Sequence, residues 1–471
     1  MRKAFFILFF FCSTRDMAQS RVFAEFLGWN ERQVQLQTIS NRTGQSSCTF
    51  VMSNDSIRAF VFTGQLKLMG QFSLPHRSGT RLLGGFMRDS SLYMFSEQPQ
   101  GELLCLSLNV VTEEIKENLF RPDPQREIKV TSISAGNHFI FITAAYRSKE
   151  ITIYDFENEE PATLIRCRFS NSLWRDLTGG YGRAIRLQNM DPDAEMDPDA
   201  LVKKNKLYLN NGSVLLVMNN HIDSTHLVNF DLQQQKVKSW VIDHNPEKEK
   251  FKLGDYSDNS FFFRNKLYYV RATSDRLMVQ VVDAVNGVIN KTYTTENGDE
   301  IDYKNTPIIQ EETANNRIKD PKDLNRTSKL LRRMTAGSAV IAAKQHGNDL
   351  VEVVVGSYEK TVRTTFVGGY NGFNQVGPYG YSGAMMFPTR PLSRRVFRDT
   401  YTQSSYFKTL LNAENYSHMP GEPVSSAYER IERYAATLKT EPGAENIFEL
   451  NGQYYYIYYD KAERRLVVLK F

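Results

Sequence analysis

Short apolar stretches recur along the chain in pairs, and each pair ends at one residue that closes the second stretch. The seven end residues are Thr63, Asn109, Asp155, Asp231, Asp283, Gly356 and Lys470. The second stretches lead directly into them, at 59–62, 106–108, 151–154, 228–230, 279–282, 353–355 and 467–469. The first stretches stand at a nearly constant distance upstream, at 50–52, 92–95, 139–142, 214–218, 267–270, 340–343 and 454–459. A constant spacing within pairs and a variable spacing between them indicate one structural module used seven times.

The interval between modules predicts the architecture. Thr63 to Asn109 and Asn109 to Asp155 are each the length of a four-stranded propeller blade, about 40–50 residues. One complete module is predicted as an antiparallel meander with strands at 260–263, 267–270, 277–282 and 288–294. The sequence therefore predicts an all-β fold, a seven-bladed β-propeller, with six or eight blades or two β-sandwich domains as the alternatives. The two stretches of each pair are expected to be the second and third strands of a four-stranded blade.

The two ends of the chain are expected to share a blade. The sequence stops at 466–471, inside the second stretch of the seventh pair, so this module lacks a fourth strand. Residues 22–39 precede the first pair and are predicted to supply it. Such a closure removes an exposed sheet edge.

The modules resemble β-propeller repeats, and the resemblance covers most of residues 20–471. Residues 281–287, with the sequence VVDAVNG, are similar to the strand–turn motif of quinoprotein-type propeller repeats, although Tyr293 stands where those repeats carry a tryptophan. The resemblance implies a secreted, bacterial-type β-propeller protein without assigning it to a family.

The first residues have the pattern of a secretion signal. Arg2 and Lys3 precede an apolar run at 4–12 that is too short to span a bilayer, and Ala18 offers a cleavage point. We expect a signal peptide at 1–18 and a single propeller domain at 19–471. The protein is accordingly expected to be secreted, periplasmic or on the cell surface.

Charge and cysteine content exclude several functions. The net charge is only +5, and removing 1–18 brings it closer to neutrality, which leaves no electrostatic footprint for nucleic acid. No later apolar run is long enough to cross a membrane. Cys48, Cys105 and Cys167 are far apart and odd in number, which favours buried thiols over a disulfide framework.

Three insertions are expected to carry function. They lie near 169–205, 296–328 and 366–445, and each is predicted to join the fourth strand of one blade to the first strand of the next. In a propeller these connections emerge on one face, so the insertions should gather there. Long loops on a rigid scaffold are where binding residues concentrate.

The first insertion contains a duplicated acidic sequence. Its carboxylates alternate along the chain, at Asp191, Asp193, Glu195, Asp197 and Asp199. Carboxylate oxygens are the ligands that Ca²⁺ prefers, so these residues form a candidate metal site. The pattern lacks the central glycine and terminal glutamate of an EF-hand, and a solvated acidic loop is the alternative.

The second insertion is rich in Asn, Asp, Lys and Arg, and the third combines glycine with aromatic and basic residues. Gly and Pro disfavour regular structure at 368–388, and exposed rings there would present stacking surfaces. The candidate ligand-binding residues are Tyr370, Phe373, Tyr379, Tyr381, Arg390, Arg394 and Arg395. An amphipathic helix is predicted at 425–438. The alternative is a loop whose rings pack over the propeller.

No catalytic motif is evident. The seven histidines include no HExxH pattern, and no glycine-rich phosphate loop is present. We therefore expect a non-catalytic binding or scaffold module at the cell envelope, with a protein, peptide or glycan as partner and no cofactor other than Ca²⁺. The alternative is a propeller enzyme, a hydrolase or lyase acting on a glycan.

Overall fold

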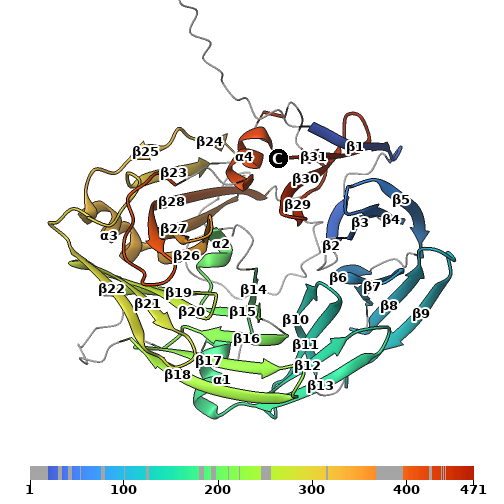
Figure 1. The fold of residues 1–471 in the computed structure, drawn as a ribbon, viewed down its shortest axis with the longest axis horizontal. Coiled ribbons are helices and arrows are strands. Elements are labelled where there is room, and N and C mark those ends of the chain that lie inside the picture. The colour runs from blue at the N-terminus through green and yellow to red at the C-terminus, as the bar shows by residue number, and fades with distance from the viewer. Residues whose placement is uncertain are drawn as a thin grey trace, which may run out of the picture.

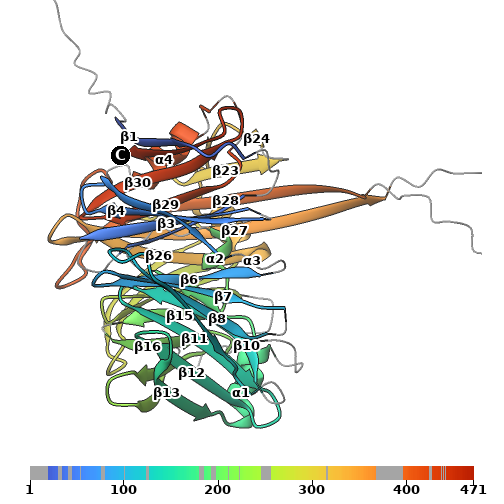
Figure 2. The ribbon, with the colours of Figure 1, turned by 90° about the vertical axis from the view of Figure 1, so that its right-hand side faces the viewer.

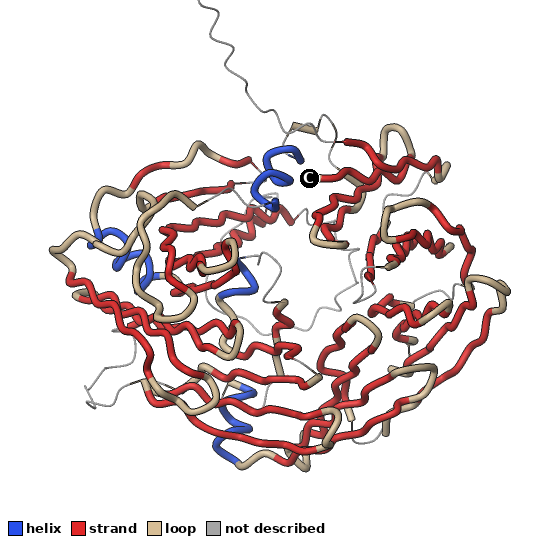
Figure 3. The backbone as a smooth tube through the Cα atoms, in the orientation of Figure 1, coloured by secondary structure: helices blue, strands red, loops and turns tan. Residues whose placement is uncertain are grey.

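Strands make up most of the protein, as the computed structural model shows in Figures 1 and 3. The structure describes residues 20–29, 34–40, 45–53, 55–75, 80–99, 101–123, 127–179, 185–191, 198–210, 212–221, 223–244, 256–314, 317–366, 396–423, 427–435, 437–438, 440 and 442–471. These residues form seven β-sheets arranged around a ring, which is a β-propeller fold. We number the sheets 1 to 7 in chain order.

The first three sheets are four-stranded antiparallel meanders. Sheet 1 comprises β2 (Gln35–Ser40), β3 (Ser46–Met52), β4 (Ile57–Thr63) and β5 (Leu68–Leu74). Sheet 2 comprises β6 (Arg81–Arg88), β7 (Ser91–Glu97), β8 (Leu103–Asn109) and β9 (Ile115–Phe120). Sheet 3 comprises β10 (Ile128–Ala135), β11 (His138–Ala145), β12 (Glu150–Phe156) and β13 (Pro161–Arg168). In each sheet the first strand is nearest the centre of the ring (Figure 1).

Sheets 4 and 5 follow the same plan, with one added strand. Sheet 4 comprises β14 (Gln188–Met190), β15 (Asn205–Asn210), β16 (Ser213–Met218), β17 (Ser224–Asp231) and β18 (Lys236–Asp243). Its short β14 pairs in parallel with β15. Sheet 5 comprises β19 (Tyr256–Phe263), β20 (Lys266–Thr273), β21 (Arg276–Asp283) and β22 (Ile289–Glu296). The predicted meander between 260 and 294 is confirmed.

The last two sheets depart from chain order. Sheet 6 has the strand order β24-β23-β28-β27-β26, and β25 also pairs with β23. Its strands are β23 (Ile309–Ala314), β24 (Arg317–Ile318), β25 (Lys322–Asp323), β26 (Ser338–His346), β27 (Leu350–Phe366) and β28 (Val396–Asn412). Sheet 7 comprises β29 (Glu445–Leu450), β30 (Gln453–Asp460) and β31 (Arg465–Lys470). It is completed by β1 (Ser20–Phe26) from the start of the chain.

The predicted sharing of sheet 7 between the chain ends is confirmed. β1 pairs antiparallel with β31, from Ser20 opposite Lys470 to Phe26 opposite Arg465. The other strand in the predicted segment, β2, instead begins sheet 1. Pairing β1 with β31 covers an edge that sheet 7 would otherwise expose.

The core lies between neighbouring sheets. Along β4, Phe60 and Phe62 join a buried cluster shared with sheet 7, whereas Ala59 and Val61 join one shared with sheet 2. Successive side chains of a strand point to opposite faces, so strands packed on both sides read as continuous apolar runs. This explains why the paired apolar stretches were visible in the sequence.

All seven predicted strand pairs are antiparallel neighbours in the structure. Six of them are the second and third strands of the regular four-strand meander of their sheet. In sheet 6 the pair is β26 and β27, and β26 is the innermost strand, so its predicted place within the sheet was wrong. The outer part of that sheet comes from β28 and from β23, which precedes the pair in sequence.

All three predicted insertions contain sheet strands: the first includes β14 of sheet 4, and the other two include strands of sheet 6. The segment 296–328 includes β23, which pairs with β28 from Ile309 opposite Tyr406 to Ala314 opposite Tyr401. The segment 366–445 includes β28 itself, so the expectation that it follows the last strand of its sheet was wrong. Strands β27 and β28 form a long hairpin that projects beyond the ring (Figure 2).

The structure describes four helices, α1 (Asn171–Thr178), α2 (Pro198–Leu201), α3 (Thr327–Ala336) and α4 (Ala427–Ala435). The helix predicted at 425–438 is confirmed as α4, whose Ile431 packs on Tyr456, Val467 and other residues of sheet 7. No helix among the described residues is long and apolar enough to cross a membrane.

One face of the ring collects the added elements. In Figure 2, α1, α3 and the far ends of β27 and β28 all lie toward the same side. This agrees with the expectation for a propeller. The connection from the last strand of one sheet to the first strand of the next should lie on the same face as the turn between the second and third strands within a sheet. We call this side the insertion face.

The three cysteines among the described residues are free thiols. Cys48 and Cys105 are buried, as predicted, and Cys167 is half-buried. Burial raises the pKa of all three thiols, which keeps them protonated and unreactive.

Candidate functional site

The first insertion binds sheets 3 and 4 together at the insertion face. Asn189 lies on β14, the innermost strand of sheet 4. Its Oδ1 accepts a hydrogen bond from Thr131 Oγ1 at 3.2 Å, and its Nδ2 donates to the Ser132 carbonyl at 2.7 Å. Both partners belong to β10 of sheet 3, so the inserted strand bridges two sheets.

A buried lysine stands where β15 begins. Lys206 is 1% exposed, and its Nζ donates to Asn259 Oδ1 at 2.6 Å and to the Ser260 carbonyl at 2.5 Å. Burial, followed by the neighbouring charge of Lys204, holds the pKa of Lys206 well below its usual range. A lowered pKa favours the neutral amine, which is the form of lysine that acts as a base.

Asn259, in the middle of β19, connects this lysine to α2 and to β26. Its side chain is fully buried, and Nδ2 donates to the Leu201 carbonyl at 2.9 Å and to the Ala339 carbonyl at 3.0 Å. Leu201 ends α2 of the first insertion, and Ala339 lies on β26. One amide side chain therefore joins sheets 4, 5 and 6.

An ion pair and a tyrosine extend the network. Lys204 Nζ lies 2.5 Å from Asp258 Oδ1, and Tyr269 OH donates to Asp258 Oδ2 at 3.1 Å. Arg271 Nε donates to Tyr269 OH at 2.9 Å. Asp258 and Arg271 are 5% and 4% exposed, and they carry opposite charges on either side of Tyr269 OH. Burial and the nearby Asp258 carboxylate raise the pKa of Tyr269.

A histidine completes the cluster. The His244 ring stacks on the Tyr269 ring at 3.7 Å, and Nε2 lies 2.8 Å from Thr225 Oγ1. Thr225 donates its hydroxyl proton to Asn219 Oδ1, so we assign the histidine proton to Nε2. Burial, and then the charge of Arg271, lowers the pKa of His244 to about 3, so the ring is neutral.

We call these residues the sheet 4–5 cluster: Lys204, Lys206, Thr225, His244, Asp258, Asn259, Tyr269 and Arg271. It combines a neutral imidazole, a lysine of lowered pKa, a carboxylate and a guanidinium in a buried setting. Environments that push pKa values apart in this way are typical of acid–base sites, and they also occur in structural networks.

A cavity of about 670 Å³ lies in the second insertion. It is bounded by the segment that follows β22 and by the residues that begin α3. Its lining combines the polar residues Asn297, Asp299, Glu300, Lys304, Asn325, Arg326, Thr327 and Ser328 with the apolar Ile301, Pro307, Ile308 and Leu324. The volume is in the range of small-molecule sites, about 300–1,000 Å³.

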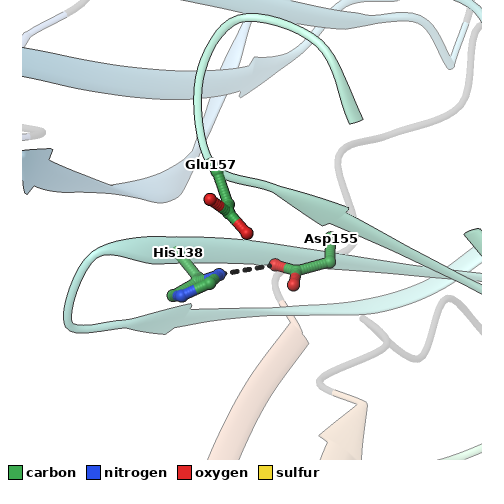
Figure 4. A group of neighbouring side chains, drawn as sticks. All are labelled: His138, Asp155 and Glu157. Atoms are coloured by element: carbon green, nitrogen blue, oxygen red, sulfur yellow. Dashed lines mark hydrogen bonds and ion pairs between the residues drawn. The ribbon is translucent and has the colours of Figure 1, made fainter. Parts of the chain in front are cut away.

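The opposite face carries a smaller group. His138 begins β11, and Asp155 and Glu157 lie at the end of β12 and in the turn after it. His138 Nδ1 lies 3.1 Å from Asp155 Oδ1, and the Glu157 carboxylate points toward both (Figure 4). The hydrogen bond to Asp155 raises the pKa of His138.

The sequence-predicted site residues are only partly described by the structure. All seven proposed ligand-binding residues, from Tyr370 to Arg395, lie outside the described residues. Asp193, Glu195 and Asp197 also lie outside them. Asp191 is exposed, and Asp199 Oδ2 lies 2.5 Å from Lys360 Nζ. An amine bonded to this carboxylate occupies one position that a Ca²⁺ ion would use.

Sequence reasoning missed the sheet 4–5 cluster. Lys206, Asp258, Asn259 and Arg271 each flank an apolar strand run, where a polar side chain usually faces solvent. One signal in the sequence could have revealed them. Each polar residue directly adjoins an apolar run of a strand whose two faces are both buried, so its side chain is buried as well.

Comparisons with known proteins do not add a family. No protein-family model and no curated protein matches the chain. Among solved structures, the chain is similar to the WD40 domain of SCAP from fission yeast, with 9% identity over 95% of this chain and 97% of that one and a TM-score of 0.29.

Two further structures illustrate the same level of similarity. The dihydro-heme d1 dehydrogenase NirN shares 10% identity over 69% of this chain and 54% of its own, with a TM-score of 0.30. A prolyl endopeptidase shares 9% identity over 52% of this chain, with a TM-score of 0.29, and this chain spans about a third, 32%, of its length. The fold assignment therefore rests on the sheets of this chain.

Proposed function

We propose that the protein is an extracytoplasmic binding module that receives a glycan on its insertion face. The observation that carries the proposal is the cavity of about 670 Å³, which the second insertion forms on a scaffold of packed sheets. We take the seven sheets to be the seven blades of a closed propeller, a reading supported by the β1–β31 pairing. Such a ring holds the insertions in a fixed geometry.

The lining of the cavity favours a neutral, hydroxyl-rich ligand. Asp299 and Glu300 balance Lys304 and Arg326, so the cavity has no strong net charge to select an ion. Its amide, carboxylate, hydroxyl and guanidinium groups offer donors and acceptors from several directions. The hydroxyl groups of a sugar chain both donate and accept hydrogen bonds, which suits this lining. A polar peptide is the other class of partner that the lining can accept.

Replacing Arg326 with alanine should weaken oligosaccharide binding at least about tenfold, since a hydrogen bond to a charged group contributes about 1.5–3 kcal/mol. Arg326 makes no capping hydrogen bond with its side chain at the start of α3, so the helix should persist. Lys322→Ala, on the exposed β25, is the matched control.

Binding is measured by screening the full chain on an array of neutral and acidic oligosaccharides, followed by calorimetry on the best binder. Equal affinity of Arg326→Ala and the wild type would place the site elsewhere. Binding of peptides alone would keep the cavity and change the partner class.

Export from the cytoplasm is part of the proposal. It is supported by Arg2-Lys3 and the apolar run at 4–12. Expression of the full gene should yield a chain that begins near Gln19, as read by mass spectrometry of the extracytoplasmic fraction. A cytosolic product that retains Met1 would contradict this location.

Two further predictions concern the insertion face. The stretch that contains Tyr370, Phe373, Tyr379 and Tyr381 follows the projecting β27, which supports a role in contacting the ligand. Ca²⁺ binding at the acidic duplication of the first insertion stays a proposal based on its alternating carboxylates.

The second candidate function is a glycan hydrolase or lyase. The sheet 4–5 cluster favours it, because Lys206 and His244 have strongly lowered pKa values beside Asp258 and Tyr269. Incubation with the oligosaccharide that binds best, followed by mass spectrometry, separates the two functions. Hydrolysis adds the mass of water across the products, a lyase leaves the summed mass unchanged, and a binding module returns the oligosaccharide intact.

A further inference from the structure

Asp155 occupies a position that other sheets give to a buried valine. The third strands of sheets 1, 3 and 5 each carry a register shift at their ends, between Val61 and Phe62, between Asp155 and Phe156, and between Val281 and Val282. Alignment on this shift places Asp155 with Val61 and Val281. Both valines are fully buried, and Asp155 is only 2% exposed.

A carboxylate at this position is costly. Burying an ionised group without full compensation costs several kcal/mol, whereas a valine there contributes to the core. The Asp155 side chain is 3% exposed and faces His138, whose own side chain is 30% exposed. At this position the protein therefore has a carboxylate beside a histidine near the surface in place of an apolar side chain that would stabilise the core.

The same alignment places His138 with Lys266 and Glu157 with Asp283. In sheet 5, Lys266 and Asp283 are cross-strand partners, and their Nζ and Oδ2 atoms lie 2.7 Å apart. Sheet 3 replaces that lysine, which is only a cation, by a histidine, which can also ligate a metal. It adds a second carboxylate at Asp155.

The separations suit a single ion. The ligand atoms of His138, Asp155 and Glu157 all lie within 4.8 Å of one another, and His138 Nδ1 and Asp155 Oδ1 are 3.1 Å apart. Ligands that surround Zn²⁺ at about 2.0–2.2 Å in a tetrahedron lie about 3.3–3.6 Å from each other. Figure 4 shows the three side chains directed toward a common point.

A neighbouring sheet orients the third ligand. Arg88, at the end of β6 in sheet 2, donates from Nη1 to Glu157 Oε2 and to the Glu157 carbonyl, both at 3.2 Å. The contact engages one carboxylate oxygen and leaves the other for a further partner. Hydrogen bonds of this kind commonly fix the ligands of metal sites.

We infer that His138, Asp155 and Glu157 form a site for one divalent transition-metal ion, of which Zn²⁺ is the best match, on the face opposite the insertions. One nitrogen and two carboxylate ligands suit Zn²⁺ better than Ca²⁺, which prefers oxygen alone. Water would complete the coordination. The site is independent of the glycan site.

The test is equilibrium dialysis of the full chain, stripped with a chelator, against Zn²⁺ alone. The wild type should bind one Zn²⁺ per chain, with a rise in Tm. Loss of a supporting contact alone weakens metal affinity about 10–100-fold, so Asp155→Asn, which removes a ligand, should weaken it about a hundredfold or more. Asp283→Asn, at the aligned acidic position of sheet 5, should bind as the wild type does.

Asp155→Val provides a second variant that the fold should tolerate, because sheets 1 and 5 carry valine there. It should remain folded and lose the Zn²⁺-dependent rise in Tm. The inference is overturned if the wild type binds no Zn²⁺ saturably, or if Asp155→Asn and Glu157→Gln bind it with unchanged affinity. Binding of Ca²⁺ as tight as that of Zn²⁺ and lost in Asp155→Asn would also overturn the assignment to a transition metal.

Discussion

Replacing Asn259 with alanine should lower the free energy of unfolding by about 3–5 kcal/mol, because the change removes one of the two acceptors of the buried Lys206 and the donor of two buried carbonyls. Asn259 accepts from Lys206 Nζ and donates to the carbonyls of Leu201 and Ala339. Its removal therefore breaks contacts among sheets 4, 5 and 6 at once. Urea denaturation followed by circular dichroism measures the effect.

Asn290→Ala is the matched control for this substitution. Asn290 lies on β22 and is exposed, so its replacement should change stability by no more than about 0.5 kcal/mol. If Asn259→Ala is as stable as the control, the sheet 4–5 cluster does not hold the three sheets together. Its polar groups would then be better explained as a site that water can enter than as a structural network.

Removal of residues 1–26 should destabilise the protein by about 4 kcal/mol or more, because it deletes β1. Half-buried Phe23 on β1 packs edge-on against Phe62 at 5.0 Å and Phe60 at 6.1 Å, and the loss of these contacts adds to the loss of the backbone pairing with β31. The deletion also exposes β31 as a sheet edge, so we expect aggregation.

Removal of residues 1–18 alone is the control for this truncation. It leaves β1 intact and should unfold at the same urea concentration as the full-length chain, with a monomeric profile in size-exclusion chromatography. Equal stability and equal solubility of the two truncated chains would mean that β1 does not close the ring.

The sequence predicted the repeated part of the fold well. Stretches such as 267–270 and 279–282 became neighbouring strands because both of their faces are buried, which gives unbroken apolar runs. The turn residues were also informative. Asp283 Oδ1 accepts from the Val285 and Asn286 amides, so an acidic end residue stabilises the turn that follows it.

Sheet 6 could not be predicted in the same way. Its strand β23 precedes the pair that it joins, and β28 lies beyond the glycine-rich stretch 368–388, which predicted a loop. β28 is also mixed in character, with Thr402, Gln403 and Ser405 among its apolar residues. Pairing set by contacts distant in sequence leaves no local pattern to recognise.

The candidate sites depended on such distant contacts even more. Lys206 meets Asn259, and Asn259 meets Ala339, only after three sheets have packed. Asp155 was recognised as the end residue of a strand, but its alignment with Val61 needed the register shift that the structure provides. The segments that form the cavity were predicted to be an insertion with functional potential, although β23 within that insertion was not foreseen.

Hydrogen–deuterium exchange with and without the best-binding oligosaccharide tests the central claim most directly. If the ligand binds on the insertion face, exchange should slow at 297–308 and 324–328, which line the cavity. Peptides that contain His138 and Glu157, on the opposite face, should exchange at an unchanged rate. Slower exchange confined to those peptides, with none at the cavity, would contradict the account.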